Sequence, residues 1–353
     1  MAERVIVADI GGTHARFAMA EVARGEVVAL GEPLTLRTSD FDRLEAAWAA
    51  ARSQLGEAPL AVLALAGPMR GEVVTLTNGG WHIARARLAE RLGVAQVALL
   101  NDFEAVAHAV ARLPDDAFTH IAGPDQPLSR HERITVLGPG TGLGVAHLRG
   151  REVQATEGAH LGFAPTDAFE DAVLVKLRAK YGRVSAERLV SGAGLRVIYN
   201  AMPPSPSGEG PGVGFLRPAS SQRHHPTPTP PPGSSPGRAL EGRGYDSDAE
   251  LWNAALTGTE PLATAALDRF CAIFGSVAGD LALAHGASGV AIAGGLGQRL
   301  GAHLPRSEFA ARFVAKGRYR GMMEAMPIRL VTHPQPGLYG AAAVAADQME
   351  TSK

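Results

Sequence analysis

The chain has 353 residues, 46% of them hydrophobic and 20% charged, a length that favours two domains with separate cores. Its 34 Lys and Arg against 35 Asp and Glu leave a net charge of −1, so the composition shows no basic footprint of a nucleic-acid-binding protein. The single Cys271 excludes an internal disulfide and a thiolate zinc site and suits a reducing cytoplasm, and no apolar run approaches the ~20 residues of a membrane span.

The first third of the chain alternates strand and helix signals. It opens with an apolar run at 5–10, which a glycine turn connects to two further extended runs. The predicted strands are 5–10, 16–20, 27–36, 60–65, 73–76 and 97–100, and the predicted helices are 41–55, 84–92 and 103–112. Strands and helices mixed in this order indicate an α/β fold with a twisted, mixed sheet.

A second set of elements begins at 134–137 and repeats the strand–glycine–strand design of the N-terminus. Further strands are predicted at 145–148, 290–293 and 328–331, and helices at 167–181, 185–189, 248–285 and 337–348. The duplicated pattern favours two related α/β lobes with a cleft between them.

Proline is concentrated in one segment between two predicted helices. Residues 203–236 hold 11 of the 24 prolines and show no apolar periodicity. Proline removes backbone donors, and the segment has too few apolar side chains to form a core, so we predict a disordered insertion over 203–245 without a part in catalysis. Presentation of 226–232 as a polyproline II ligand is the alternative.

Two glycine turns, one in each repeated unit, are candidates for binding phosphate. They span 9–13 and 138–144, and neither has the spacing of a P-loop or of the dinucleotide fingerprint. Glycine lets backbone N–H groups approach an anion, and Thr13 and Thr141 add hydroxyl donors. Asp9 is placed to hold a cation through its waters. A tight hairpin is the alternative for either turn alone, whereas two matched turns favour a polyphosphate site.

Five motifs together make the sequence resemble the bacterial glucokinases. They are Asp9-Ile-Gly-Gly-Thr-His-Ala-Arg16, Asn101-Asp-Phe103, Gly138-Pro-Gly-Thr-Gly-Leu-Gly-Val-Ala146, Glu157-Gly-Ala-His160 and Ala293-Gly-Gly295. They occur in the family's order, and the resemblance covers the chain except for about 202–245. That family belongs to the hexokinase, actin and Hsp70-type ATPase superfamily. The resemblance implies a two-lobed, actin-like ATPase fold of the ribonuclease H-like type with an interlobe cleft.

For the nucleotide, the resemblance implies that the two glycine turns embrace the phosphates of ATP and that Mg²⁺ bridges these phosphates. The nucleotide-binding residues it implies are Asp9, Gly11, Gly12, Thr13, Arg16, Gly138, Gly140, Thr141, Gly142, Gly294 and Gly295, with Asp9 holding Mg²⁺ through water. His14 stands where the family commonly has Asn, so the contacts of the first turn can differ.

For the sugar, Asp102 is the expected catalytic residue. It stands where a predicted strand ends and a helix starts, a place that also suits an N-cap. The two interpretations are compatible, because a cap fixes the carboxylate. On the family resemblance we favour a general base that takes the proton from a sugar hydroxyl.

Four further residues and Asn101 complete the expected sugar site. Glu157 and His160 lie three residues apart, and a metal pair, an exposed turn and a clamp for vicinal hydroxyls are the possible interpretations. No third metal ligand is evident by spacing. Glu187 and Asn78 would ordinarily be a solvated helix residue and a turn residue, and only the resemblance makes them sugar ligands.

These observations predict an enzyme that phosphorylates D-glucose at O6 with ATP and feeds glycolysis. A kinase of mannose, fructose or glucosamine is the alternative, followed by a sugar-sensing regulator without turnover. The expected domains are 1–111 with 333–353, and 112–332, the latter carrying the insertion. The Cys-rich zinc motif of the related repressor and sugar-kinase group is absent from this sequence, which indicates the zinc-free branch of the glucokinases. We expect a cytoplasmic homodimer that binds neither nucleic acid nor membrane.

Overall fold

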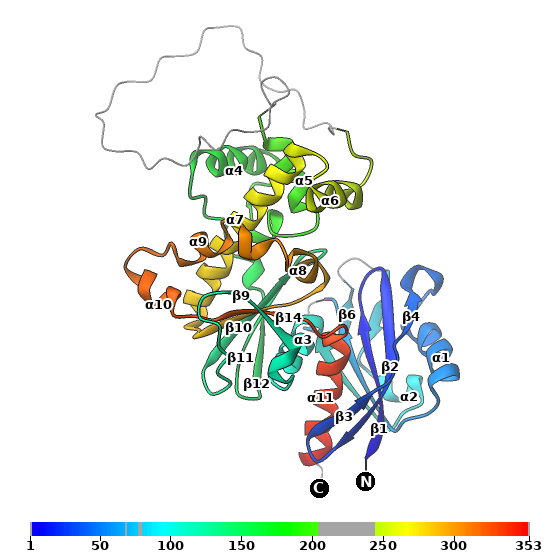
Figure 1. Cartoon of the computed structure of the whole chain (residues 1–353). Coiled ribbons are helices and arrows are strands. Elements are labelled where there is room, and N and C mark those ends of the chain that lie inside the picture. Colours follow the sequence, from blue (N-terminus) through cyan, green and yellow to red (C-terminus); the bar gives the residue numbers. More distant parts are fainter. Residues whose placement is uncertain (1, 68, 77–79, 204–243, 352–353) are drawn as a thin grey trace, which may run out of the picture.

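The computed structural model describes residues 2–67, 69–76, 80–203 and 244–351. Within them the chain forms two six-stranded mixed sheets, each packed against helices, which confirms the predicted α/β class. The N-terminal lobe is built on one sheet and the C-terminal lobe on the other, and the two lobes lie side by side (Figure 1).

The sheet of the N-terminal lobe has the order β3-β2-β1-β5-β8, with β4 paired to β2. Its strands are β1 (Glu3–Ile10), β2 (His14–Ala23), β3 (Glu26–Leu30), β4 (Leu34–Arg37), β5 (Leu60–Leu65) and β8 (Gln96–Asn101). β1 and β2 are antiparallel, whereas β1, β5 and β8 run parallel. A separate hairpin joins β6 (Val73–Thr75) and β7 (His82–Ala84).

Helices cover both faces of this sheet. On β1, Ile6 and Ala8 pack with α1 (Leu44–Leu55) and α2 (Leu88–Leu92), whereas Val5 and Val7 pack with α11 (Pro336–Thr351). Successive side chains of a strand point to opposite faces, so a strand covered on both sides is apolar throughout. This explains why β1 and β5 read as continuous hydrophobic runs.

The sheet of the C-terminal lobe repeats this design in the order β12-β11-β10-β13-β14-β9. Its strands are β9 (Phe118–Ala122), β10 (Arg133–Pro139), β11 (Leu143–Arg149), β12 (Glu152–Thr156), β13 (Gly289–Ile292) and β14 (Ile328–Val331). β10 and β11 form an antiparallel hairpin, and β10, β13 and β14 are parallel. The helices of this part are α4 (Ala168–Tyr181), α5 (Gly194–Ala201), α6 (Asp248–Thr257), α7 (Pro261–His285), α8 (Gly295–Leu300), α9 (Phe309–Val314) and α10 (Arg320–Glu324).

Helix α3 (Asp102–Val110) belongs to the cores of both lobes. Its Ala105 is buried with α11, whereas Val106 and Ala109 are buried against the C-terminal sheet. Gly340 of α11 lies so close to α3 that a side chain there would overlap the carbonyl oxygen of Ala105. The two helices therefore meet backbone to backbone between the sheets (Figure 1).

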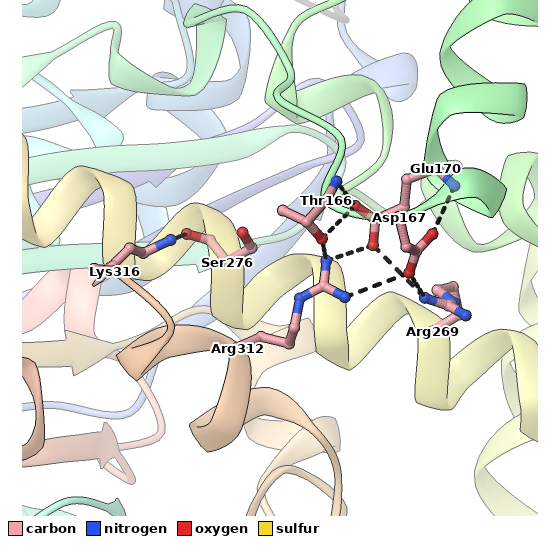
Figure 2. A network of polar contacts seen from close by, with 7 residues as sticks. All are labelled: Thr166, Asp167, Glu170, Arg269, Ser276, Arg312 and Lys316. Atoms are coloured by element: carbon pink, nitrogen blue, oxygen red, sulfur yellow. Dashed lines mark hydrogen bonds and ion pairs between the residues drawn. The ribbon is translucent and has the colours of Figure 1, made fainter. Parts of the chain in front are cut away.

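An ion-pair network joins α4, α7 and α9 (Figure 2). The carboxylate of Glu170 is fully buried and pairs with Arg312 on α9 and Arg269 on α7, with Arg312 Nη2 at 2.5 Å. The backbone N–H and hydroxyl of Thr166 also donate to it, at 2.8 and 3.0 Å. Asp167 caps α4 by accepting from the N–H of Glu170, and it pairs with Arg269. Against the opposing effect of burial, this hydrogen bond and then the guanidinium of Arg269 hold the pKa of Asp167 below its usual range. Such a network stabilises one arrangement of the three helices.

Several predicted elements are wrong in extent. The predicted helix 248–285 is two helices, α6 and α7, because Gly258 ends the first with φ +69° and Pro261 starts the second. The run 27–36 is split into β3 and β4. The predicted helix 84–92 is helical only over α2, because residue 84 ends β7 and the helix starts at Leu88. The segment 185–189 forms a single 3₁₀ turn, Ala186–Arg188. Strands β7, β9 and β12 and helices α5, α8, α9 and α10 were not predicted.

Most of the predicted insertion lies outside the described residues, which stop at 203 and resume at 244. Its predicted C-terminal limit is too far along the chain, because Tyr245 packs edge-on against Tyr199 with ring centroids 5.7 Å apart. The guanidinium of Arg196 also donates to the carbonyl oxygen of Tyr245 and pairs with Asp248. These contacts hold the N-terminal end of α6 against α5.

Among the described helices, α7 alone has the length and apolar composition of a membrane span. Of its most apolar window, 72% is buried inside the protein, as expected for the central helix of a core.

Candidate active site

Asp9 lies near the end of β1, beside the first glycine turn. Its partner across the hairpin is Arg16, whose Nη1 is 3.7 Å from Asp9 Oδ2. The turn is closed by Gly11 N–H, which donates to the carbonyl of His14 at 2.9 Å, and Thr38 Oγ1 donates to the carbonyl of Gly12 at 2.5 Å. Thr13 is exposed at the tip of the turn.

The helix that carries Asp102 is capped by its neighbour. Asn101 is the N-cap of α3, and its Oδ1 accepts from the N–H groups of Phe103 and Glu104 at 2.9 and 3.2 Å. Glu104 completes a capping box by accepting from Asn101 N–H at 3.2 Å. Asp102 is thus the first helical residue rather than the cap, and its Oδ1 accepts locally from Phe103 N–H at 2.9 Å.

The electrostatics of the site raise the pKa of both aspartates. Burial raises the pKa of Asp102 to about 6, with further contributions from the negative charges of Asp9 and Glu157. Burial also raises the pKa of Asp9, against the opposing effect of Arg16. The carboxylates of β1, α3 and the Glu157 segment therefore interact with one another, although they come from distant parts of the chain.

The second glycine turn closes the β10–β11 hairpin against α3 and β13. A side chain at Gly144 would overlap the ring of Phe103, and one at Gly138 would overlap the carbonyl oxygen of Ala293. At the tip, Gly140 accepts through its carbonyl from Gly192 N–H at 2.6 Å. A Cβ on Gly140 would meet nothing, so this glycine keeps its open side. Glycines at the neck of the hairpin therefore serve packing, whereas Gly140 at the tip has open space beside its Cα, although its N–H donates to the carbonyl of Gly142 at 2.8 Å.

The predicted clamp residues lie together beside this hairpin. His160 Nε2 is 3.8 Å from Glu157 Oε2, and His160 Nδ1 is 4.0 Å from Glu187 Oε1. The other oxygen of Glu187 accepts from Leu143 N–H at 3.0 Å, and Gly142 has no room for a side chain because of this carboxylate. Glu187 therefore links the three-residue cluster to the phosphate-loop candidate, a connection that sequence spacing did not indicate.

The glycines predicted to lie near the adenosine follow β13. Gly294 has φ +84°, a conformation that favours glycine, and a Cβ on Gly295 would meet nothing. The N–H of Ala293 donates to the carbonyl of Leu137 at 3.0 Å, which places this turn next to the base of the second hairpin. Both turns stand at the carboxyl ends of parallel strands, where open α/β sheets commonly bind ligands.

The remaining sequence predictions have different outcomes. Asn78 lies outside the described residues. Thr141 is exposed at the tip of the second hairpin, as Thr13 is at the first. Among the described residues, no group of three or more His, Cys, Asp or Glu is arranged to hold a metal ion, so the metal interpretation of Glu157 and His160 gains no third ligand. Two residues were not predicted as site residues. Gly337 lies against Asp9, and the ring of Phe103 packs against Gly144 of the second hairpin.

Comparison with known proteins gives a consistent family. The sequence model of the glucokinase family matches residues 6–348. A glucokinase of Zymomonas mobilis subsp. mobilis is 45% identical, covering 98% of each chain, and one of Stenotrophomonas maltophilia is 36% identical, covering 97% of this chain and 95% of its own. The crystal structure of a glucokinase from an Antarctic psychrotroph has a TM-score of 0.75 at 31% identity, covering 98% of this chain and 99% of its own.

Proposed function

The chain belongs to the glucokinase family and is an ATP-dependent glucose kinase, and from this premise we propose how its residues divide the transfer of phosphate to O6. The observation that supports the proposal most strongly is the position of Asp102. It stands at the first position of α3, released from capping by Asn101, and interacts with Asp9 from one lobe and Glu157 from the other. A carboxylate at this junction can reach a sugar held between nucleotide and clamp.

In the proposed reaction, Asp102 is the general base. Its carboxylate takes the proton of the O6 hydroxyl while O6 forms a bond to the γ-phosphorus, and the bond from that phosphorus to the β–γ bridging oxygen breaks to release ADP. General base catalysis contributes roughly 10²–10⁴-fold. Positioning and charge neutralisation account for most of the remaining acceleration in phosphoryl transfer. A pKa of about 6 leaves Asp102 ionised at neutral pH and still able to accept a proton.

The two hairpins are proposed to hold the phosphates of ATP. Exposed Thr13 and Thr141 mark the two tips, and backbone N–H groups of the glycine turns supply donors without added positive charge. Because the chain has almost no net charge, these backbone donors would bind the phosphates in place of a surface rich in Lys and Arg. Arg16, whose Nη1 is 3.7 Å from Asp9 Oδ2, supplies a guanidinium group beside the first turn.

The donor set fits Mg²⁺ that arrives with the nucleotide. Mg²⁺ commonly keeps several waters and binds one or two carboxylates together with substrate phosphates, rather than an all-protein cage. Asp9 is such a carboxylate, and its negative charge contributes to the raised pKa of Asp102. When bound, the ion would neutralise negative charge on the phosphates, and Asp9 would hold it through water.

The sugar is proposed to lie on the cluster of Glu157, His160 and Glu187. Carboxylate and imidazole suit vicinal hydroxyls, because each hydroxyl both donates and accepts. Asn101 uses one amide N–H toward the carbonyl of Gly67 at 3.4 Å, which leaves its second N–H for a hydroxyl. Glu187 also holds Leu143 N–H of the second hairpin, so sugar and nucleotide sites share one carboxylate.

The assembly and location of the enzyme are also proposals. The family resemblance supports a cytoplasmic homodimer, in which closure of the lobes would exclude water as a competing acceptor. Light scattering of the purified chain measures the oligomeric state directly.

Replacement of Asp102 tests the assignment of the base. Asp102→Ala is expected to lose at least 100-fold in kcat while glucose still binds, because the carboxylate acts on the transferred proton and not on the hydroxyls held by the clamp. Turnover is measured by coupled ADP release and glucose binding by calorimetry. Asp116→Ala, at an exposed aspartate of the C-terminal lobe, is the matched control. Near wild-type turnover of Asp102→Ala would show that the base is another group.

A further inference from the structure

Gly337, in the first turn of α11, lies directly against the carboxylate of Asp9. An added Cβ there would be 3.0 Å from both Cγ and Oδ2 of Asp9 and 3.5 Å from its Cβ. A separation of 3.0 Å is shorter than ordinary van der Waals contact, so one of the two groups would have to move by a few tenths of an ångström. The Asp9 carboxylate can therefore occupy its position because residue 337 has no side chain.

The backbone gives no other reason for glycine at this position. Gly337 does not have the positive φ seen at Gly294 or Gly286. It stands inside a helix that begins at Pro336, where Ala is more favourable than Gly by about 1 kcal/mol. Local propensity therefore favours alanine at 337, whereas the packing against Asp9 favours glycine.

Helix α11 is held too firmly to withdraw from an added methyl group. Leu338 and Ala341, which flank this turn, are fully buried in the core of the N-terminal lobe. One turn further on, Gly340 packs against the backbone of Ala105 in α3. Asp9 is different, because its side chain is 28% exposed and its pairing with Arg16 is long, at 3.7 Å. The Asp9 side chain is thus the part that moves.

We infer that Gly337 is a positioning residue that sets the place of the Asp9 carboxylate, and through it the nucleotide half of the site. Gly337 itself touches neither substrate nor phosphate in this inference, which rests on the role proposed for Asp9. The contact couples α11 to the first phosphate turn, as Gly340 couples the same helix to the start of α3. One helix would then position both aspartates.

The variant Gly337→Ala tests this inference with little risk to folding. Displacing Asp9 by a few tenths of an ångström is expected to weaken equilibrium binding of Mg²⁺–ATP, and to raise its KM, by about threefold to tenfold. Glucose affinity is expected to stay at the wild-type value, and the melting temperature is not expected to fall, because helix propensity favours Ala at this position. Calorimetric titration with a non-hydrolysable ATP analogue and Mg²⁺ supplies a readout that does not depend on turnover.

Gly321→Ala is the matched control, because Gly321 also lies in a helix and a Cβ there would meet nothing. It is expected to leave both affinities unchanged. Wild-type nucleotide affinity in Gly337→Ala would overturn the inference. A joint loss of glucose affinity and melting temperature would also overturn it, because Gly337 would then be a general packing residue. If the wild-type chain binds nucleotide but phosphorylates no sugar, the proposed function fails, and the binding titrations still decide the role of Gly337.

Discussion

At the scale of single residues, the ionisation of Asp102, the proposed general base, is expected to affect both catalysis and stability. A general base works only as the carboxylate, and burial with two neighbouring negative charges raises the pKa of Asp102 to about 6. We therefore predict that kcat/KM for glucose falls tenfold per pH unit below about pH 6 and is level above it. The profile is measured with saturating Mg²⁺–ATP. An acid limb near pH 4, the range of an ordinary aspartate, would contradict the assignment.

The same raised pKa predicts that Asp102 destabilises the folded enzyme when ionised. The folded-state pKa of about 6 lies above the ordinary value of 3.8, so folding favours the protonated acid. The contribution of Asp102 to the free energy of unfolding is fully present below its unfolded-state pKa and is lost as the pH rises through its folded-state pKa. Ionised Asp102 therefore lowers the free energy of unfolding at pH 8 by roughly 2–3 kcal/mol relative to the protonated acid.

Asp102→Asn should therefore raise the free energy of unfolding at pH 8, with a smaller gain at pH 5, while turnover is lost. The Asn side chain can still accept from Phe103 N–H, so the local helix start is kept. Urea unfolding at the two pH values measures the effect, with Asp116→Asn as the control. Equal or lower stability at pH 8 would show that the ionised carboxylate is not strained in the folded state.

The sequence indicated the adjacent candidates Asn101 and Asp102 but not which of them caps the helix. Asn101 and Asp102 are adjacent and both suit an N-cap, and only the structure shows that Asn101 is the cap. The contact of Gly337 with Asp9 joins positions more than 300 residues apart, and the sequence around it reads only as the start of a helix. Contacts of this kind depend on packing between elements, which local patterns do not encode.

At the scale of elements, the network around Glu170 fixes α4 against α7 and α9. Glu170→Ala would leave the guanidinium groups of Arg312 and Arg269 without their shared buried carboxylate. Breaking such a buried pair is expected to cost about 3–5 kcal/mol in unfolding free energy. Chemical denaturation measures this cost.

The matched control for Glu170 is its exposed neighbour. Asp171→Ala also removes an acid from the first turn of α4, so it reports the helix-dipole contribution without touching the network. It should cost less than about 1 kcal/mol. If the two variants lose similar stability, the network does not hold the three helices together.

Element types were predictable where periodicity was strong, and their limits were not. The apolar pattern continues across 248–285, which hides the break, although Gly258 and Pro261 are the residues that make it. Strand β12 alternates exposed and half-buried residues at a sheet edge, so it lacks the apolar run that marks β1 and β5. Glu170 reads as a solvated helix residue, and only tertiary packing makes it buried.

At the scale of the whole molecule, the repeated strand–glycine–strand pattern predicted two related lobes, and two sheets with antiparallel hairpins and parallel strands confirm it. The sequence did not show that α3 and α11 pass between these lobes. That arrangement places Asp102 at the junction, since α3 is buried on both sides. A boundary of the N-terminal domain at 111 stays a prediction, because α3 contributes to both cores.

The most direct test of the account is coupled ADP release by the purified chain across a panel of hexoses, with Asp102→Ala beside the wild type. The account predicts strong, Mg²⁺-dependent activity with glucose, formation of glucose 6-phosphate, weaker kcat/KM with mannose, fructose and glucosamine, and near-complete loss in the variant. Little turnover of glucose beside strong turnover of another hexose would contradict it.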